Sequence, residues 1–198
     1  MPRKPRHLVD NGFYHIMSRG HNKCELFHSR KDYEKYRDLI IEYKQTFPCD
    51  IYHYCLMPNH VHILLKIEHG NDLPCLMKQI NQNYTNYYKK LYGISGNLFQ
   101  GRYKGLIIET EGYLLECGRY IERNPLKSGM ENDLYRYPFS SFNFYARGKS
   151  DKMLAPNPLY SELSRSEEER RRCYCEYVLK ERLEDHIKDS NAWHGDTL

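Results

Sequence analysis

Hydrophobic and polar residues alternate along two neighbouring stretches of the chain. One covers residues 50–57, the other covers residues 60–67, and Pro58-Asn59 lies between them. Alternation with a period of two is typical of a strand that buries one face. Because the connection is so short, the sequence predicts an antiparallel hairpin.

Three other stretches repeat their apolar residues at intervals of three and four, which is the period of an α-helix. Ser29 is expected to cap the first helix, which Pro48 ends, and Gly93 ends the second. The third runs from residue 111 to about residue 123, before Pro125. The apolar positions of the three helices are Tyr33, Tyr36, Ile40 and Tyr43, then Leu76, Ile80, Tyr84, Tyr87, Tyr88 and Leu91, then Leu114, Cys117 and Ile121.

Residues 12–19 and 104–109 have the β-rich content of two more strands. The first six elements then follow as strand, helix, strand, strand, helix and strand, which is the signature of the ferredoxin-like split βαβ fold. We therefore expect an α+β protein with an antiparallel four-stranded sheet and helices on one face. The helix of residues 111–123 follows the fourth strand.

The last third of the chain has a different character. Residues 131–165 are rich in turn-forming residues, and Ser166 to Glu169 form a capping box for a final helix at about 166–188. We predict three parts: a basic arm at 1–11, a central domain at 12–130, and a C-terminal extension at 131–198 that packs on the core. The apolar stripe expected on the final helix is Cys175, Leu179, Leu183 and Ile187.

Composition narrows the class of protein but does not decide its function. The 198 residues are 40% hydrophobic and 28% charged, which fits one globular domain with an extension. No apolar stretch is long enough for a membrane span or a secretory signal, so we expect a cytoplasmic protein without a membrane partner. The seven cysteines lack paired spacing and are interpreted as reduced. A net charge of +4 decides little, but 19 tyrosines, several beside Lys and Arg, suit stacking on a single nucleic-acid strand.

His60 and His62 are the first candidates for chemistry. A strand points residues i and i+2 to the same face, about 7 Å apart along its axis, so both imidazoles could reach one ion. The residues that alternate with them are apolar, so we expect the histidines on the face that the helices leave accessible. An isolated His-x-His pattern is common by chance, and it indicates a metal site only in context.

Tyr120 and Asn124 are the second pair, four residues apart on the third helix and therefore on one side of it. Asn124 offers a carbonyl oxygen, which with two imidazoles could hold Mg²⁺ or Mn²⁺ and leave open positions for a phosphate. The Tyr120 phenol is a weak nucleophile unless it is activated. Taken alone, Tyr120 would be interpreted as a tyrosine at the rim of the core.

Five motifs in order change that interpretation, because together they cover residues 12 to about 142. The chain resembles the REP-associated tyrosine transposases, a branch of the single-tyrosine HUH transposases. The motifs are Tyr14-His15-Ile16-Met17-Ser18-Arg19-Gly20, Met57-Pro58-Asn59-His60-Val61-His62, Leu98-Phe99-Gln100-Gly101-Arg102-Tyr103-Lys104, then Tyr113-Leu114-Leu115 with Arg119-Tyr120-Ile121-Glu122-Arg123-Asn124-Pro125, and Tyr137-Pro138-Phe139-Ser140-Ser141.

The resemblance implies that residues 12–130 are an HUH catalytic domain. In it His60 and His62 bind the metal, Asn124 completes that site, and Tyr120 is the nucleophile. It implies single-stranded DNA hairpins from palindromic repeats as substrate, a 5′-phosphotyrosine intermediate, and a monomer or homodimer. Lys127-Ser128-Gly129 departs from the Arg-Ala-Gly that the family often carries, and the chain after Met153 matches no motif of the family.

Several basic residues are candidate DNA contacts, although a solvated surface would explain most of them equally well. These residues are Arg3, Lys4, Arg6, Arg19, Arg102 and Lys104. His15 receives no chemical role, since an ordinary sheet histidine fits it as well.

Two other functions stay open. The first is a DNA-binding module on the same fold that no longer cuts, against which the complete set His60, His62, Tyr120 and Asn124 argues. The second is an RNA-binding domain of the RRM kind, which shares the element order but carries aromatic residues on its sheet where this chain has histidines.

Overall fold

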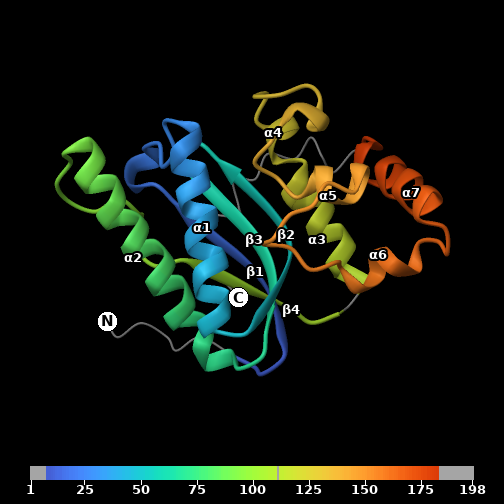
Figure 1. The fold of residues 1–198 in the computed structure, drawn as a ribbon, viewed down its shortest axis with the longest axis horizontal. Helices are drawn as coiled ribbons and strands as arrows, with labels where there is room; N and C mark the ends of the chain where they lie inside the picture. Colours follow the sequence, from blue (N-terminus) through green and yellow to red (C-terminus); the bar gives the residue numbers. More distant parts are fainter. Residues whose placement is uncertain (1–7, 111, 183–198) are drawn as a thin grey trace.

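The structure is a computed structural model that describes residues 8–110 and 112–182 (Figure 1). A four-stranded sheet separates two groups of helices. The elements are β1 (Gly12–Arg19), η1 (His21–Lys23), α1 (Arg30–Thr46), β2 (Cys49–Met57), β3 (His60–Ile67), η2 (Gly70–Asp72), α2 (Leu73–Tyr92), β4 (Lys104–Ile108), α3 (Gly112–Glu122), α4 (Asn124–Lys127), η3 (Leu134–Arg136), α5 (Phe142–Arg147), α6 (Pro158–Glu162) and α7 (Glu167–Leu179).

The sheet has the strand order β2-β3-β1-β4, and every neighbouring pair is antiparallel. Met57 lies opposite His60, so Pro58 and Asn59 form the expected tight turn. The two central strands, β1 and β3, are neighbours in the sheet but not in the chain, because α1 and β2 lie between them in the sequence. This is the arrangement of the split βαβ motif. The predicted α+β class and four-stranded sheet are confirmed.

Local signals in the sequence begin and end the helices as expected. The Ser29 side chain accepts a hydrogen bond from the third residue of α1, while the backbone N–H of Ser29 donates to Asp32 Oδ2 over 2.8 Å. This reciprocal capping box satisfies two donors that the first turn cannot pair internally. Gly93 ends α2 in the left-handed region, at φ 65°, where glycine pays no Cβ penalty.

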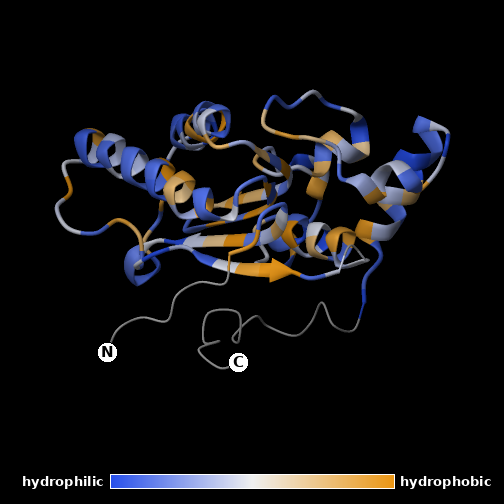
Figure 2. Ribbon diagram, turned by 90° about the horizontal axis from the view of Figure 1, so that it is seen from below, coloured by the Kyte–Doolittle hydropathy of each residue, from blue (hydrophilic) through white to orange (hydrophobic). Residues whose placement is uncertain are grey.

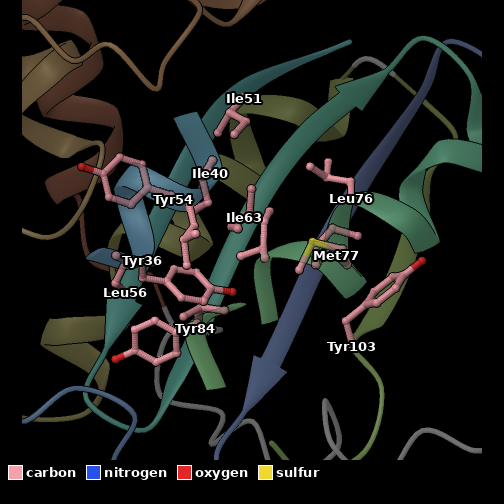
Figure 3. Close-up of a cluster of buried hydrophobic side chains, with 14 of the residues drawn as sticks. Tyr36, Ile40, Ile51, Tyr54, Leu56, Ile63, Leu76, Met77, Tyr84 and Tyr103 are labelled. Carbon is pink, nitrogen blue, oxygen red and sulfur yellow. The ribbon is translucent and has the colours of Figure 1, made fainter. Parts of the chain in front are cut away.

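One face of the sheet packs on α1 and α2. The residues of β3 that alternate with the histidines, from Val61 to Ile67, are buried there together with aromatic side chains of both helices. Figure 3 shows Tyr36, Ile63 and Tyr84 in this cluster. The outward sides of the two helices are largely hydrophilic, whereas the strands behind them carry the hydrophobic residues (Figure 2).

The helices α1 and α2 share one face as expected, but the opposite face is not left open, because α3 covers it. Leu114, Cys117 and Ile121 of α3 pack against Leu64 and its neighbours on β2 and β3. In Figure 1, α3 lies across the sheet from α1 and α2. The physical reason is that β1, β2 and β3 carry buried apolar residues on both faces, so neither face can be left to water.

The C-terminal residues form α5, α6 and α7, which pack on α3 and on one another. Tyr174 and Val178 are the buried residues of α7, whereas Leu179 is 40% exposed. The predicted stripe of Cys175 and Leu179 is therefore wrong by one position, because Tyr174 and Val178 are the side chains that pack in one cluster with Tyr145. Leu183 and Ile187 lie outside the described residues.

No helix within residues 8–110 and 112–182 is long and apolar enough to cross a membrane. The division of the chain at residue 130 stays a prediction. Contacts do cross that boundary, since α3 touches both α6 and α7.

Candidate active site

His60 and His62 lie near the start of β3, with their ring centroids 5.0 Å apart and their planes nearly perpendicular. Each has its Nδ1 atom held by a neighbour. Nδ1 of His60 is 2.6 Å from Oδ1 of Asn59, and Nδ1 of His62 is 2.9 Å from Nε2 of His15 on β1. A partner at one ring nitrogen orients an imidazole and fixes which nitrogen carries the proton, as is usual for metal-binding histidines.

The pair formed by His15 and His62 is held neutral by its surroundings. Burial lowers the pKa of His15 to about 4. Burial also lowers the pKa of His62 well below its ordinary value. His60, His15 and Lys127 lower this pKa further, because a positive charge on His62 would be repelled by positive charge on these neighbours. Neutral imidazole is the form that binds a metal ion. Nδ1 of His62 can then donate its proton to Nε2 of His15.

Tyr120 lies on the last turn of α3, above the two buried histidines. Its ring centroid is 5.9 Å from that of His62 and 5.7 Å from that of His15, and it meets both rings edge to face. The ring is half-buried and packs on the cluster under α3. The phenol is thus held beside the imidazoles by helix packing.

Asn124 and Lys127 continue from α3 into the short helix α4. The side-chain amide N–H groups of Asn124 donate to the carbonyl oxygens of Tyr120 and Ile121, over 3.0 and 3.1 Å. Its side-chain carbonyl oxygen is consequently the atom that suits a cation. Lys127 holds its ammonium 4.5 Å from the centroid of the Tyr120 ring, a cation–π geometry that puts positive charge beside the phenol.

Within the described residues, no group of three or more His, Cys, Asp or Glu side chains could by itself hold a metal ion. A divalent ion here would rest on His60, His62 and the Asn124 oxygen. Two oriented neutral imidazoles and an amide oxygen are chemically suited to this, and they would leave positions open for a phosphate. The residues present therefore fit the metal site that the sequence predicts.

Comparison with known proteins identifies the family. Residues 8–124, more than half of the chain, match the sequence pattern of a protein family described as "Transposase IS200 like". The chain belongs to the IS200-like transposase family. The matched range contains His60, His62, Tyr120 and Asn124.

Two relatives of this IS200-like transposase agree with the resemblance found in its sequence. A Haemophilus influenzae protein that carries the name REP-associated tyrosine transposase is 26% identical over 120 residues, which span 51% of this chain and 65% of the relative. The solved structure of a REP-associated tyrosine transposase bound to a REP hairpin has the same fold, with a TM-score of 0.64 and 23% identity, covering 78% of this chain and 92% of the other. The resemblance to the REP-associated tyrosine transposases is confirmed.

The expectation that the histidines lie on an accessible face is wrong for this transposase. His62 is only 2% exposed, because α3 covers that face of the sheet, and His60 is half-buried at the first position of β3. The site therefore opens at the end of the sheet.

Three predicted DNA contacts lie at this same end of the sheet. Arg19 is opposite His60 in the register of β1 and β3, and Lys104 pairs with Met17, whose other neighbour is His62. Arg102 is exposed two residues before β4 begins. Arg3, Lys4 and Arg6 lie outside the described residues.

Two residues beside the site had no assigned role in the sequence. His15 shares the face of His62, and strand alternation could have indicated this, since Tyr14 and Ile16 face the core. Its 2.9 Å contact with His62 depends on the register of β1 and β3. In the sequence, Lys127 stands out only as a departure from the family pattern, and no local signal indicates that it lies over Tyr120.

The helix that carries Tyr120 is fastened by a buried carboxylate. Glu122 is fully buried and accepts hydrogen bonds from His53 Nδ1 at 3.0 Å, Ser141 Oγ at 2.5 Å and Tyr174 Oη at 2.7 Å. Asn157 Nδ2 lies 3.0 Å from the other ring nitrogen of His53. The network joins α3 to β2, α5 and α7, so the position of Tyr120 depends on elements from both halves of the chain.

Arg119 of α3 and Arg123, which lies between α3 and α4, contact the end of α7. Arg119 donates to the carbonyl oxygens of Tyr177 and Lys180, and Arg123 donates to that of Val178, over 3.2, 2.6 and 2.8 Å. The last carbonyl groups of a helix have no partner within it, and cationic donors there also complement the helix dipole. The charged residues that flank Tyr120 thus have structural contacts in this protein.

Proposed function

We propose that this IS200-like transposase nicks and rejoins single-stranded DNA by transesterification, with Tyr120 as nucleophile. The observation that carries the proposal is the position of Tyr120, edge-on to His62 at 5.9 Å and one helical turn before Asn124. A nucleophile beside a possible metal site is the arrangement that phosphodiester cleavage requires. A protein that only binds DNA has no need of this combination.

The reaction conserves the number of ester bonds. The Tyr120 oxygen forms a bond to phosphorus, and the bond between phosphorus and the 3′ oxygen breaks. The products are a 5′-phosphotyrosine and a strand that ends in a 3′-hydroxyl, which takes up the proton lost by the phenol. A 3′-hydroxyl can attack the phosphotyrosine and restore a phosphodiester, so no external energy source is required.

The side chains around Tyr120 have distinct tasks in this proposal. His15 keeps Nδ1 of His62 occupied, so that the Nε2 atom of His62 points away from it toward a ligand. Lys127 stabilises negative charge as it develops on the phenol oxygen. A divalent ion held by His60, His62 and Asn124 would act as a Lewis acid on the phosphate when it is bound.

Hairpins from palindromic repeats are the proposed substrate. The REP-associated tyrosine transposase of similar fold is bound to a REP hairpin in its solved structure. Arg19, Arg102 and Lys104 at the open end of the site could contact the phosphates of such a DNA.

The test mixes the protein with labelled single-stranded hairpins and Mn²⁺ or Mg²⁺, and looks for a covalent adduct on a denaturing gel. We expect an adduct that is absent after Tyr120→Phe and after addition of EDTA. Because the substitution removes only one hydroxyl, hairpin affinity should change by less than about three-fold. Tyr113→Phe is the matched control, since Tyr113 lies on the same helix and is 66% exposed.

The outcomes separate the two DNA-binding functions. Tight hairpin binding without an adduct, with either metal, would support the non-catalytic binding module. Full adduct formation by Tyr120→Phe would show that another residue is the nucleophile.

A further inference from the structure

A groove of about 560 Å³ lies between α2 and the segment that leads into β4. It belongs to the side of the sheet covered by α1 and α2, whereas His62 lies on the other side, beside Tyr120 of α3. None of the chemistry proposed above uses it. One wall is α2, with Lys78, Gln82 and Lys89, and the other is the segment of residues 96–103, with Asn97, Phe99 and Arg102.

The charge of the groove suits a polyanion. Lys78 and Lys89 stand at the two ends of one stripe of α2, about 16 Å apart at 1.5 Å per residue. Arg102 contributes a third cation from the facing wall. The described lining residues include no carboxylate. The separation of the lysines is enough for a few successive phosphates of one strand.

The floor and walls of the groove suit bases. Met77 and Tyr103 form an apolar floor that is continuous with the core, and both are labelled in Figure 3. Phe99 is half-exposed at its edge and offers an aromatic ring. The amides of Asn97 and Gln82 can donate to or accept from base edges. Rings and cations along a narrow groove are the usual means of binding an unpaired strand.

The groove is also joined to the open end of the active site. Phe99 forms a bridge with Gly20, and the backbone N–H of Gln100 donates to the Arg19 carbonyl oxygen over 2.8 Å. Arg19 is in turn opposite His60. A strand that leaves the histidines therefore needs to pass only the end of β1 to enter the groove.

We propose that this groove binds the unpaired DNA strand that continues from the scissile position, by stacking bases on Phe99 and pairing phosphates with Lys78, Lys89 and Arg102. The inference rests on the proposed function, because it takes single-stranded DNA as the substrate. It adds a second binding site on the far side of the sheet from Tyr120. The groove is too small for a duplex, so it distinguishes unpaired from paired DNA.

The experiment measures fluorescence anisotropy of labelled hairpins, with and without an extension of about eight unpaired thymidines at either end. The groove variants are the double variant Lys78→Gln with Lys89→Gln, and Gln82→Glu, which adds a carboxylate that repels phosphates from an exposed position. The controls are Lys31→Gln with Lys90→Gln, and Asn86→Glu. All three control positions are exposed and lie outside the groove.

We expect the extension to tighten binding by about ten-fold in the wild-type and control proteins, since stacking one base on a ring is worth roughly five-fold or more and two phosphate contacts add to it. The gain should fall below about three-fold in the groove variants. Loss of two phosphate contacts should also lower the slope of log affinity against log salt by about 1.4. Photocrosslinking of 4-thiothymidine in the extension should label the peptide that contains Phe99.

Each other outcome has a defined meaning. An equal gain in all variants, or crosslinks only to peptides outside the groove, would overturn the groove site, while an adduct with Tyr120 would leave the proposed function in place. A gain that depends on the groove, without any adduct, would support the groove and contradict the nuclease. If the wild-type protein gains nothing from the extension, the inference is overturned.

Discussion

At the scale of single residues, the site depends on hydrogen bonds that orient imidazoles. His60 is held by its chain neighbour Asn59, whereas His62 is held by His15, which is 47 positions away in the sequence. Both contacts occupy Nδ1 and direct Nε2 toward a ligand. The low pKa of His15, about 4, keeps its Nε2 available as an acceptor at neutral pH.

Replacement of His15 by Ala should weaken metal binding without removing the nucleophile. Loss of a partner that orients a metal ligand typically costs about 10- to 100-fold in metal affinity. We therefore expect His15→Ala to raise the Mn²⁺ concentration needed for half-maximal adduct formation by about that factor, with the maximal rate largely regained at high Mn²⁺. His69→Ala, at an exposed position, is the control. An unchanged metal dependence of His15→Ala would contradict a role in orienting His62.

Lys127 should act on the rate of adduct formation. Its ammonium lies over the Tyr120 ring, where it favours negative charge on the phenol oxygen. We expect Lys127→Gln to slow single-turnover adduct formation by about ten-fold, which corresponds to about 1.4 kcal/mol, and Lys127→Arg to keep most of the rate. Lys149→Gln, at an exposed position two residues after α5 ends, controls for the loss of one charge. Equal rates in Lys127→Gln and the wild type would exclude this role.

At the scale of elements, α3 is the piece that has to be positioned, because it carries Tyr120. This helix can approach β2 closely because its residue at the contact, Gly118, has no side chain. A Cβ atom at Gly118 would lie 2.6 Å from Nε2 of His53, a buried ring that is itself bound to Glu122 and Asn157. The helix would have to move away from the sheet to admit a methyl group.

Gly118→Ala should therefore be destabilising, although alanine is the better helix former. Overpacking of this kind costs about 1–3 kcal/mol in the free energy of unfolding, and the displaced helix should also form adduct more slowly. Gly112→Ala is the matched control, because a Cβ atom there meets no heavy atom within 4 Å. Urea unfolding of both variants measures the difference. A stability equal to that of the wild type for Gly118→Ala would mean that α3 packs less closely on β2.

At the scale of the whole molecule, the C-terminal region completes the sheet that it follows. The backbone N–H of Leu56 donates to the Phe139 carbonyl oxygen over 2.9 Å, and that of Ser141 donates to the Tyr54 carbonyl oxygen over 3.0 Å. These bonds cover the outer edge of β2, which would otherwise offer free pairing groups. The Phe139 ring also stacks on Tyr33 of α1, with the centroids 3.8 Å apart.

A chain cut after residue 130 should consequently fail to fold independently. It would expose the edge of β2 and the cluster under α3, and it would remove Ser141 and Tyr174, two of the hydrogen-bond donors to Glu122. We expect this shortened chain to show no cooperative thermal transition and to aggregate, whereas the full chain unfolds cooperatively. A cooperative transition within a few degrees of that of the full chain would instead support residues 12–130 as a separate domain.

The sequence by itself determined the four strands and the three long helices α1, α2 and α3. These depend on local patterns: alternation in residues 60–67, the cap at Ser29 and the glycine at Gly93. The residues of the proposed chemistry came from the resemblance to the REP-associated tyrosine transposases, whose motifs are also short and local. Such signals lie within a few residues of one another, so they can be read without knowing the fold.

Only the tertiary structure decided which face α3 covers, that His15 contacts His62, and that Lys127 lies over Tyr120. It also decided which side of α7 is buried. The physical reason is that both faces of the sheet carry apolar residues, so local patterns do not show which face receives a third helix. The register and the packing of distant segments fix those contacts, and neither is visible in a local pattern.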